Sequence, residues 1–89
     1  MNAIRISVSG RVQGVFFRRT SKEQADALGI TGWIRNTDEG NVEIHAEGSP
    51  DALEQFQAWC RKGPPAARVD IVKVEDIPDE GFEAFEIAA

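Results

Sequence analysis

Residues 4–28 read IRISVSGRVQGVFFRRTSKEQADAL, and this stretch decides the fold. Apolar and polar residues alternate over residues 4–9, which predicts a strand with one buried and one wet face. Over residues 17–28, apolar and small residues recur at helical spacing. A glycine-punctuated segment, residues 10–16, separates the two patterns. The stretch therefore predicts a strand, a loop and a helix in direct succession.

The rest of the chain predicts four more strands and a second helix. Strands are expected over residues 31–36, 42–47 and 69–74, with a short closing strand over 82–87. The alternation slips between Ile71 and Val72, which predicts a β-bulge there.

The second helix has clear start and stop signals. It is expected to begin at Ser49, because a serine cap is followed by Pro50 at the first helical position and by an acid in the first turn. Gly63 and two prolines after it end the helix. Gly29 suits the left-handed turn that ends the first helix.

The element order is βαββαβ plus an edge strand. This order predicts an α+β, ferredoxin-like sandwich, in which two helices cover one face of an antiparallel sheet. Right-handed crossovers make the first and second strands parallel, with the third between them. The carboxyl ends of strands one and two then lie at one edge of the sheet, about 10 Å apart. We therefore expect loop 10–16 and Asn36, which ends the second strand, to face a common space within one domain, residues 1–89.

Composition narrows the class of protein. The chain has 89 residues, a net charge of −5 and one cysteine, Cys60, so it has no internal disulfide, and we expect Cys60 to lie in the core. No apolar run is long enough for a membrane span, and no signal peptide is evident, so we expect a cytoplasmic protein. The acidic balance disfavours nucleic acid as a partner. Residues 1–22 nevertheless carry five basic residues and no acid, which indicates a local anion site.

The loop before the first helix has the chemistry of an anion site. Glycines allow close approach of the backbone to a ligand, and consecutive N–H groups can converge on an anion. The helix that follows adds its unpaired N–H groups, and Arg18 adds a planar cation that matches phosphate oxygens. The loop has neither the Walker nor the dinucleotide pattern. A structural turn with solvated arginines is the alternative reading.

Three segments resemble the acylphosphatase family. Residues 10–18, GRVQGVFFR, look like its first signature, and residues 32–43, GWIRNTDEGNVE, resemble its second. Residues 63–69, GPPAARV, are similar to the segment that follows its second helix. The likeness runs from about residue 4 to residue 87.

The resemblance implies the ferredoxin-like fold and the hydrolysis of acyl phosphates to a carboxylate and inorganic phosphate, without a metal or cofactor. The family's phosphate-gripping arginine corresponds to Arg18, and its water-positioning asparagine to Asn36. Its phosphate loop, which acts through backbone N–H groups, corresponds to Gln13, Gly14, Val15, Phe16 and Phe17. Thr37 beside Asn36 and Ser21 on the helix are expected to support these residues.

We expect a monomer that acts on a small-molecule acyl phosphate and binds neither nucleic acid nor membrane. Other readings are a non-catalytic anion-binding or regulatory domain of the same family, and an RNA-binding domain that uses the open sheet face. Glu43, His45 and Glu47 alternate along one strand and are conceivable metal ligands, but we expect them to be a solvated face.

Overall fold

Five strands and two helices follow one another in the predicted order. A computed structural model describes residues 2–88. The elements are β1 (Asn2–Arg11), α1 (Phe17–Leu28), β2 (Thr31–Asn36), β3 (Val42–Gly48), α2 (Pro50–Lys62), β4 (Arg68–Ile77) and β5 (Phe85–Ile87). Of the helices within residues 2–88, none is long and apolar enough to cross a membrane.

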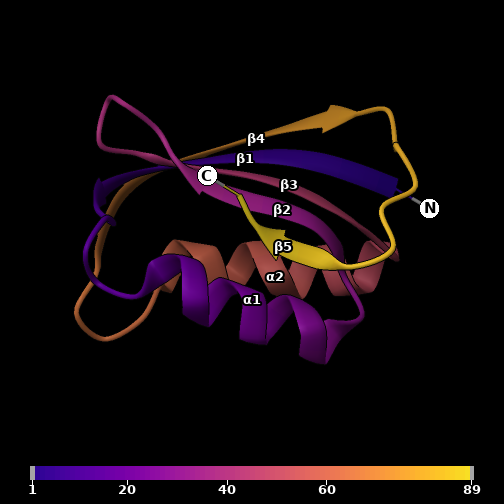
Figure 1. The fold of residues 1–89 in the computed structure, drawn as a ribbon, viewed down its shortest axis with the longest axis horizontal. Helices are drawn as coiled ribbons and strands as arrows, with labels where there is room; N and C mark the ends of the chain where they lie inside the picture. Colours follow the sequence, from indigo (N-terminus) through magenta and orange to yellow (C-terminus); the bar gives the residue numbers. More distant parts are fainter. Residues whose placement is uncertain (1, 89) are drawn as a thin grey trace.

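The strands form one sheet in the order β4-β1-β3-β2-β5, with both helices on one of its faces (Figure 1). β3 pairs antiparallel with β1 and with β2, so β1 and β2 run in the same direction, as the crossover rule predicts. β5 pairs parallel to β2 and makes the sheet mixed. The ferredoxin-like prediction is therefore confirmed, with a parallel edge strand added to an antiparallel sheet.

The predicted helix boundaries are confirmed by the local chemistry. Gly29 ends α1 with φ 71°, a left-handed conformation that glycine adopts without strain. Ser49 caps α2, because its side-chain oxygen accepts a hydrogen bond from the Ala52 N–H. Gly63 ends α2, and its N–H donates to the Trp59 carbonyl.

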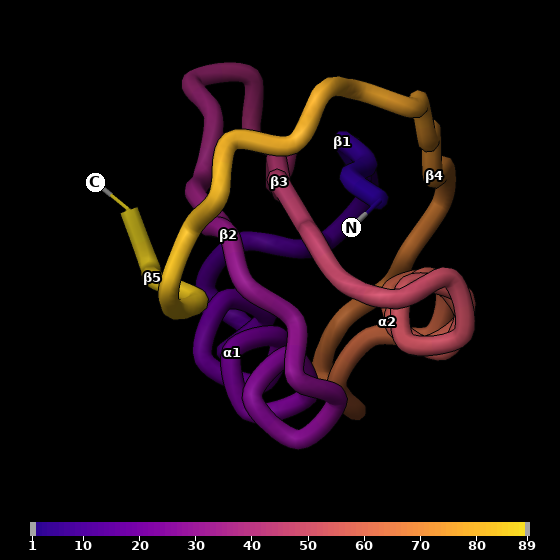
Figure 2. Tube along the Cα trace, turned by 90° about the vertical axis from the view of Figure 1, so that its right-hand side faces the viewer, coloured from indigo at the N-terminus to yellow at the C-terminus, as the bar shows by residue number. Residues whose placement is uncertain are grey.

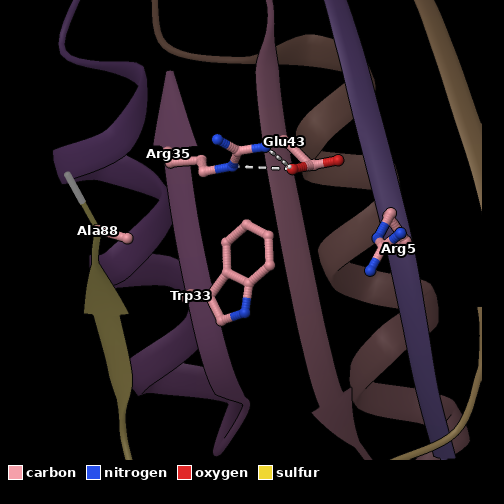
Figure 3. A pocket seen from close by; sticks show the side chains of 5 residues that line it. All are labelled: Arg5, Trp33, Arg35, Glu43 and Ala88. Carbon is pink, nitrogen blue, oxygen red and sulfur yellow. Dashed lines mark hydrogen bonds and ion pairs between the residues drawn. The ribbon is translucent and has the colours of Figure 1, made fainter. Parts of the chain in front are cut away.

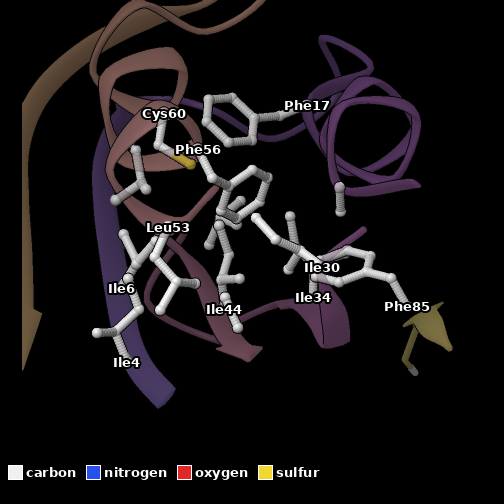
Figure 4. Close-up of a cluster of buried hydrophobic side chains, with 14 of the residues drawn as sticks. Ile4, Ile6, Phe17, Ile30, Ile34, Ile44, Leu53, Phe56, Cys60 and Phe85 are labelled. Carbon is white, nitrogen blue, oxygen red and sulfur yellow. The ribbon is translucent and has the colours of Figure 1, made fainter. Parts of the chain in front are cut away.

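The core lies between the sheet and the two helices (Figure 4). Alternate residues of β1 and β3 point into it, and α2 adds an apolar stripe at helical spacing. The fully buried members include Ile6, Val8, Phe17, Ile34, Val42, Ile44, Phe56, Cys60 and Phe85. The predicted core position of Cys60 is confirmed.

Two local boundaries differ from the prediction. β1 continues through Gly10 and Arg11, so the loop begins at Val12 and not at Gly10. The β-bulge lies where Ser9 and Gly10 of β1 meet residues 69–71 of β4, because Ser9 pairs with Ile71 while Gly10 pairs with Val69. The sequence predicts the β-bulge between Ile71 and Val72, where the pairing is in fact regular. The predicted position is therefore wrong by about one residue pair.

A crossing segment, residues 78–84, covers part of the sheet face opposite the helices. It leaves edge strand β4, passes over the face and reaches β5 at the other edge (Figure 2). His45 and Glu47 lie beneath it and are both fully buried. The prediction that these two residues form a solvated face is wrong, because a segment distant in sequence shields them from water. Glu43, the third member, is part-exposed.

Candidate functional site

A cavity of about 330 Å³ opens at the carboxyl ends of β1 and β2. Its lining comes from the loop after β1, the first turn of α1, the last residue of β2 and strand β5. The lining residues are Val12, Gly14, Phe16, Phe17, Arg18, Arg19, Asn36 and Ile87. The cavity thus brings together Arg18 and Asn36, the two residues predicted to carry the chemistry.

Helix α1 begins at this cavity with an open N-terminus. The preceding residue, Phe16, has φ 65° and ψ 21°, and it makes no side-chain capping hydrogen bond. The first turn contains no acidic residue. Because the first N–H groups of a helix have no partner within the helix, this end offers hydrogen-bond donors and the positive end of the helix dipole to an anion.

Arg18 lies in the first turn of α1 and is partly exposed. Within residues 2–88, no ion pair or side-chain hydrogen bond involves Arg18, although other arginines do form ion pairs, for example Arg35 with Glu43. Arg19 lines the same cavity and is also without an ion pair in the described chain. The cavity therefore carries two cations with no protein carboxylate to neutralise them, which suits an anionic ligand.

Asn36 is the last residue of β2 and presents a desolvated acceptor. Its Oδ1 atom is buried, and no hydrogen-bond partner for it exists among residues 2–88. A buried acceptor without a partner is costly unless a ligand or water completes it. The amide therefore has an unused acceptor site beside the cavity.

Gln13 and Thr37 join the loop to the β2–β3 turn. The Gln13 side-chain amide donates to the carbonyl oxygens of Thr37 and Asn41, each at 2.9 Å. The Thr37 hydroxyl accepts a hydrogen bond from the Asn41 N–H at 3.1 Å. Gln13 and Thr37 lie outside the cavity lining. Their side chains thus hold the loop and the end of β2 in register.

Val15 and Ser21 point into the protein and away from the cavity. Val15 is a core residue with 5% exposure. Ser21 lies one turn after Arg18 on α1, is fully buried, and has an Oγ atom without a hydrogen-bond partner in the described chain. Their side chains pack within the fold, and neither lines the cavity.

Sequence reasoning did not predict Val12 and Ile87 as lining residues. Val12 is almost fully buried, whereas Ile87 is 43% exposed. Ile87 reaches the site because β5 pairs with β2, placing Ile87 beside Ile34. Short-range sequence patterns carry no signal for such a contact between the end of the chain and the middle.

A second cavity, about 520 Å³, lies on the sheet face away from the helices (Figure 3). It is larger than the first, but each of its two arginines has a carboxylate within 4.0 Å. The Arg35 guanidinium contacts Glu43 at 2.7 Å and lies over the Trp33 ring, and Arg5 lies 4.0 Å from Glu75. We assign the functional site to the smaller cavity because its cations are unpaired and its helix end is open.

The buried pair His45 and Glu47 holds the crossing segment. His45 Nε2 and Glu47 Oε2 are 2.7 Å apart, and the Glu47 carboxylate accepts hydrogen bonds from the N–H groups of Glu80, Gly81 and Phe82. Burial acts to raise the pKa of Glu47, but the bonds from His45 and the three backbone N–H groups outweigh it and lower the pKa overall. Within residues 2–88, no three His, Cys, Asp or Glu side chains are grouped to hold a metal ion.

Comparison with known proteins adds to this geometry. The acylphosphatase family model matches residues 4–87. An acylphosphatase of Rubrobacter xylanophilus is 50% identical over 78 residues, which cover 88% of this chain and 71% of that protein. The crystal structure of acylphosphatase from Bacillus subtilis superimposes on this chain with a TM-score of 0.97 at 40% sequence identity. The superposition covers all of both chains. An acylphosphatase structure from Coxiella burnetii gives a TM-score of 0.94 at 39% identity, over 98% of this chain and 92% of that one.

Proposed function

Because the chain belongs to the acylphosphatase family, we propose that it hydrolyses acyl phosphates to a carboxylate and inorganic phosphate. In this proposal Arg18 and the loop N–H groups of residues 13–17 hold the phosphate, and Asn36 orients the attacking water. One observation carries the assignment of roles: an unpaired guanidinium, an uncapped helix start and the Asn36 side chain share one cavity.

The reaction suits a site of this kind. An acyl phosphate is a mixed anhydride, so its carboxylate is a good leaving group and needs little acid catalysis. Water attacks phosphorus in line, the bond from phosphorus to the acyl oxygen breaks, and both bonding electrons leave with the carboxylate. The transition state spreads negative charge over three equatorial oxygens. Arg18 and the N–H groups stabilise that charge, because they are aimed at it before the reaction begins.

Asn36 contributes orientation and not basicity. Its side-chain amide holds the water, either through the carbonyl oxygen, which accepts a hydrogen bond, or through the NH₂ group, which donates one, and so directs an oxygen lone pair at phosphorus. Among the described residues that line the cavity, none carries a carboxylate, imidazole or thiol. We therefore propose that a phosphate oxygen of the substrate takes the proton of the attacking water.

The proposed proton route has a kinetic consequence. Between about pH 5 and pH 8, the rate should follow only the ionisation of the substrate. Rate profiles for substrates with different phosphate pKa values should therefore shift with the substrate. A limb at a constant pH for all substrates would show that a protein group titrates and would refute this route.

The direct test is hydrolysis of benzoyl phosphate by the purified protein in excess EDTA. Arg18→Ala should lower the rate by about 10²–10³ and weaken inhibition by inorganic phosphate. Asn36→Ala should lower kcat while leaving phosphate inhibition nearly unchanged. Arg61→Ala is the matched control, because it removes an exposed arginine that does not line the cavity.

The outcomes separate the proposals. Rapid turnover in EDTA that is lost in both site variants supports the reaction and both roles. Unchanged kcat in the Asn36 variant removes Asn36 from the mechanism. A folded wild-type protein that binds phosphate but shows no turnover would instead be a non-catalytic anion-binding or regulatory domain.

We also propose that the protein acts as a single-domain monomer in the cytoplasm, on small molecules and without nucleic acid. The net charge of −5 supports the last point, because an acidic protein is repelled by phosphate backbones. Size-exclusion chromatography with light scattering tests the monomer, and a mass of twice the chain would refute it.

A further inference from the structure

Phe16 combines two features that folding alone disfavours. Its side chain is 70% exposed, and its backbone has φ 65°. Within residues 2–88, Phe16 is the one residue other than glycine with a positive φ. Glycine would adopt this conformation without strain, so the turn itself does not call for a phenylalanine. Strain of this kind gathers at functional sites, where the side chain has a use.

Ile87 is a second exposed apolar residue at the same place. Three large apolar side chains are strongly exposed in the described chain, and two of them, Phe16 and Ile87, line the proposed catalytic cavity. The third, Ile71, lies on β4 at the opposite edge of the sheet. Phe16 and Ile87 come from opposite ends of the sequence, so a local pattern does not explain why they share a cavity.

The exposure of the lining residues distinguishes the buried floor of the cavity from its mouth, which is open to solvent. Val12 and Phe17 are buried and lie at its floor, Arg18 and Asn36 are partly exposed, and the exposed residues at its mouth are Phe16 and Ile87 together with Gly14 and Arg19. If Arg18 and the loop N–H groups hold the phosphate, the acyl group of a substrate extends toward the mouth. There it meets two large apolar side chains, with Arg19 as the one charged side chain among the exposed lining residues.

We propose that Phe16 and Ile87 form a subsite for the acyl group, and that the preferred substrates are acyl phosphates with aromatic or branched apolar acyl groups. This inference rests on the proposed hydrolysis of acyl phosphates. An apolar acyl group at the mouth covers exposed apolar surface that water otherwise contacts. An aromatic group also stacks on the Phe16 ring.

The experiment compares kcat/KM for benzoyl phosphate and acetyl phosphate. Benzoate and acetate are leaving groups of similar basicity, so the ratio of the two values reports mainly on contacts with the acyl group. For the wild type we expect a ratio of about 10 to 100 in favour of benzoyl phosphate, the range for a modest apolar contact. Any effect on phosphate binding is common to both substrates and cancels in the ratio.

The variants are Phe16→Gly, which keeps the left-handed backbone and removes the ring, and Ile87→Ala. Each should lower the benzoyl-to-acetyl ratio by about 3- to 10-fold. Ile71→Ala is the matched control, because it removes an exposed apolar side chain on edge strand β4 that does not line the cavity, and its ratio should equal that of the wild type. Thermal melts confirm that each variant is folded.

A ratio that stays within twofold of the wild-type value in both site variants would overturn the inference and leave the proposed function standing. A preference for succinyl phosphate over benzoyl phosphate would overturn it too, because Arg19 at the cavity would then dominate recognition. If the wild type hydrolyses none of these substrates, the proposed function fails, and the subsite fails with it.

Discussion

Replacing Glu47 by glutamine should destabilise the fold strongly, although Glu47 lies outside the proposed catalytic cavity. The Glu47 carboxylate accepts hydrogen bonds from the N–H groups of Gly81 at 3.0 Å and Phe82 at 3.3 Å, and from the Glu80 N–H at its other oxygen. His45 Nε2 completes the set at 2.7 Å. These bonds fix the crossing segment to β3 across the sheet face.

The size of the expected stability loss follows from the number of hydrogen-bond acceptors that the side chain at position 47 offers. A glutamine has one oxygen and places an NH₂ group where the second carboxylate oxygen was. If its oxygen keeps the bonds to Gly81 and Phe82, the NH₂ group faces the Glu80 N–H, which then has no acceptor, and it also faces His45 Nε2, which can accept from it only when that nitrogen carries no proton. An unpaired buried donor costs about 1–3 kcal/mol, and the change from charged to neutral acceptor weakens the other bonds by roughly 1 kcal/mol in total. The expected loss is therefore about 2–4 kcal/mol.

Urea unfolding followed by tryptophan fluorescence measures this loss. Trp33 is a suitable probe because its ring stacks on His45 with centroids 6.0 Å apart, and Phe82 of the crossing segment packs edge-on against the same His45 ring. The loss corresponds to a melting temperature lower by on the order of 10–25 °C for a domain of this size. Glu43→Gln on the same strand is the matched control, because Glu43 forms a partly exposed ion pair that contributes about 0–1 kcal/mol.

The same contacts determine how the contribution of Glu47 to folding stability changes with pH. The pKa of Glu47 is lowered from its ordinary value of 4.5, because the bonds to the carboxylate outweigh the effect of burial. A group whose pKa is lower in the folded state stabilises the protein above about pH 4.5 and loses that contribution as the pH falls through the folded pKa. The difference in stability between wild type and Glu47→Gln should therefore shrink on acidification below about pH 4.5. A Glu47→Gln protein within about 0.5 kcal/mol of the wild type at pH 7 would refute the reasoning.

Three further predictions concern other parts of the protein. Gln13→Ala removes two hydrogen bonds between the loop and the β2–β3 turn. The free energy of unfolding measured in urea should therefore fall by about 1–3 kcal/mol, and kcat/KM should fall as well. Full activity would show that the loop keeps its position without these bonds. Ser21→Ala removes a buried hydroxyl that has no hydrogen-bond partner in residues 2–88. The variant should be as stable as the wild type or more stable by up to about 1 kcal/mol. A marked loss of activity would reveal a supporting role for the hydroxyl. Burial raises the pKa of the Cys60 thiol to about 12, so a thiol reagent at pH 8 should label Cys60 only as fast as the protein unfolds, and rapid labelling of the native protein would contradict its buried position.

Local chemistry made most of the fold predictable. The serine cap at Ser49 and the left-handed glycine at Gly29 satisfy helix ends through contacts within a few residues, so the sequence alone locates both boundaries. The common cavity of Arg18 and Asn36 was also predictable, because right-handed crossovers bring the carboxyl ends of β1 and β2 to one edge. The roles of the two residues stay predictions until the variants are measured.

Contacts between segments that are distant in sequence could not be predicted from local sequence patterns. Alternation along β3 places His45 and Glu47 on the face opposite the helices, and that assignment of face is correct. Alternation has no information about what covers that face, so the same pattern suggested a solvated surface. The sequence by itself determined the strand and helix order, the sides on which residues lie and the edge at which the site forms, because these depend on neighbours along the chain and on chain handedness. Only the tertiary structure decided that residues 78–84 bury Glu47 and that Ile87 reaches the cavity, because each depends on the path of a segment far away in sequence.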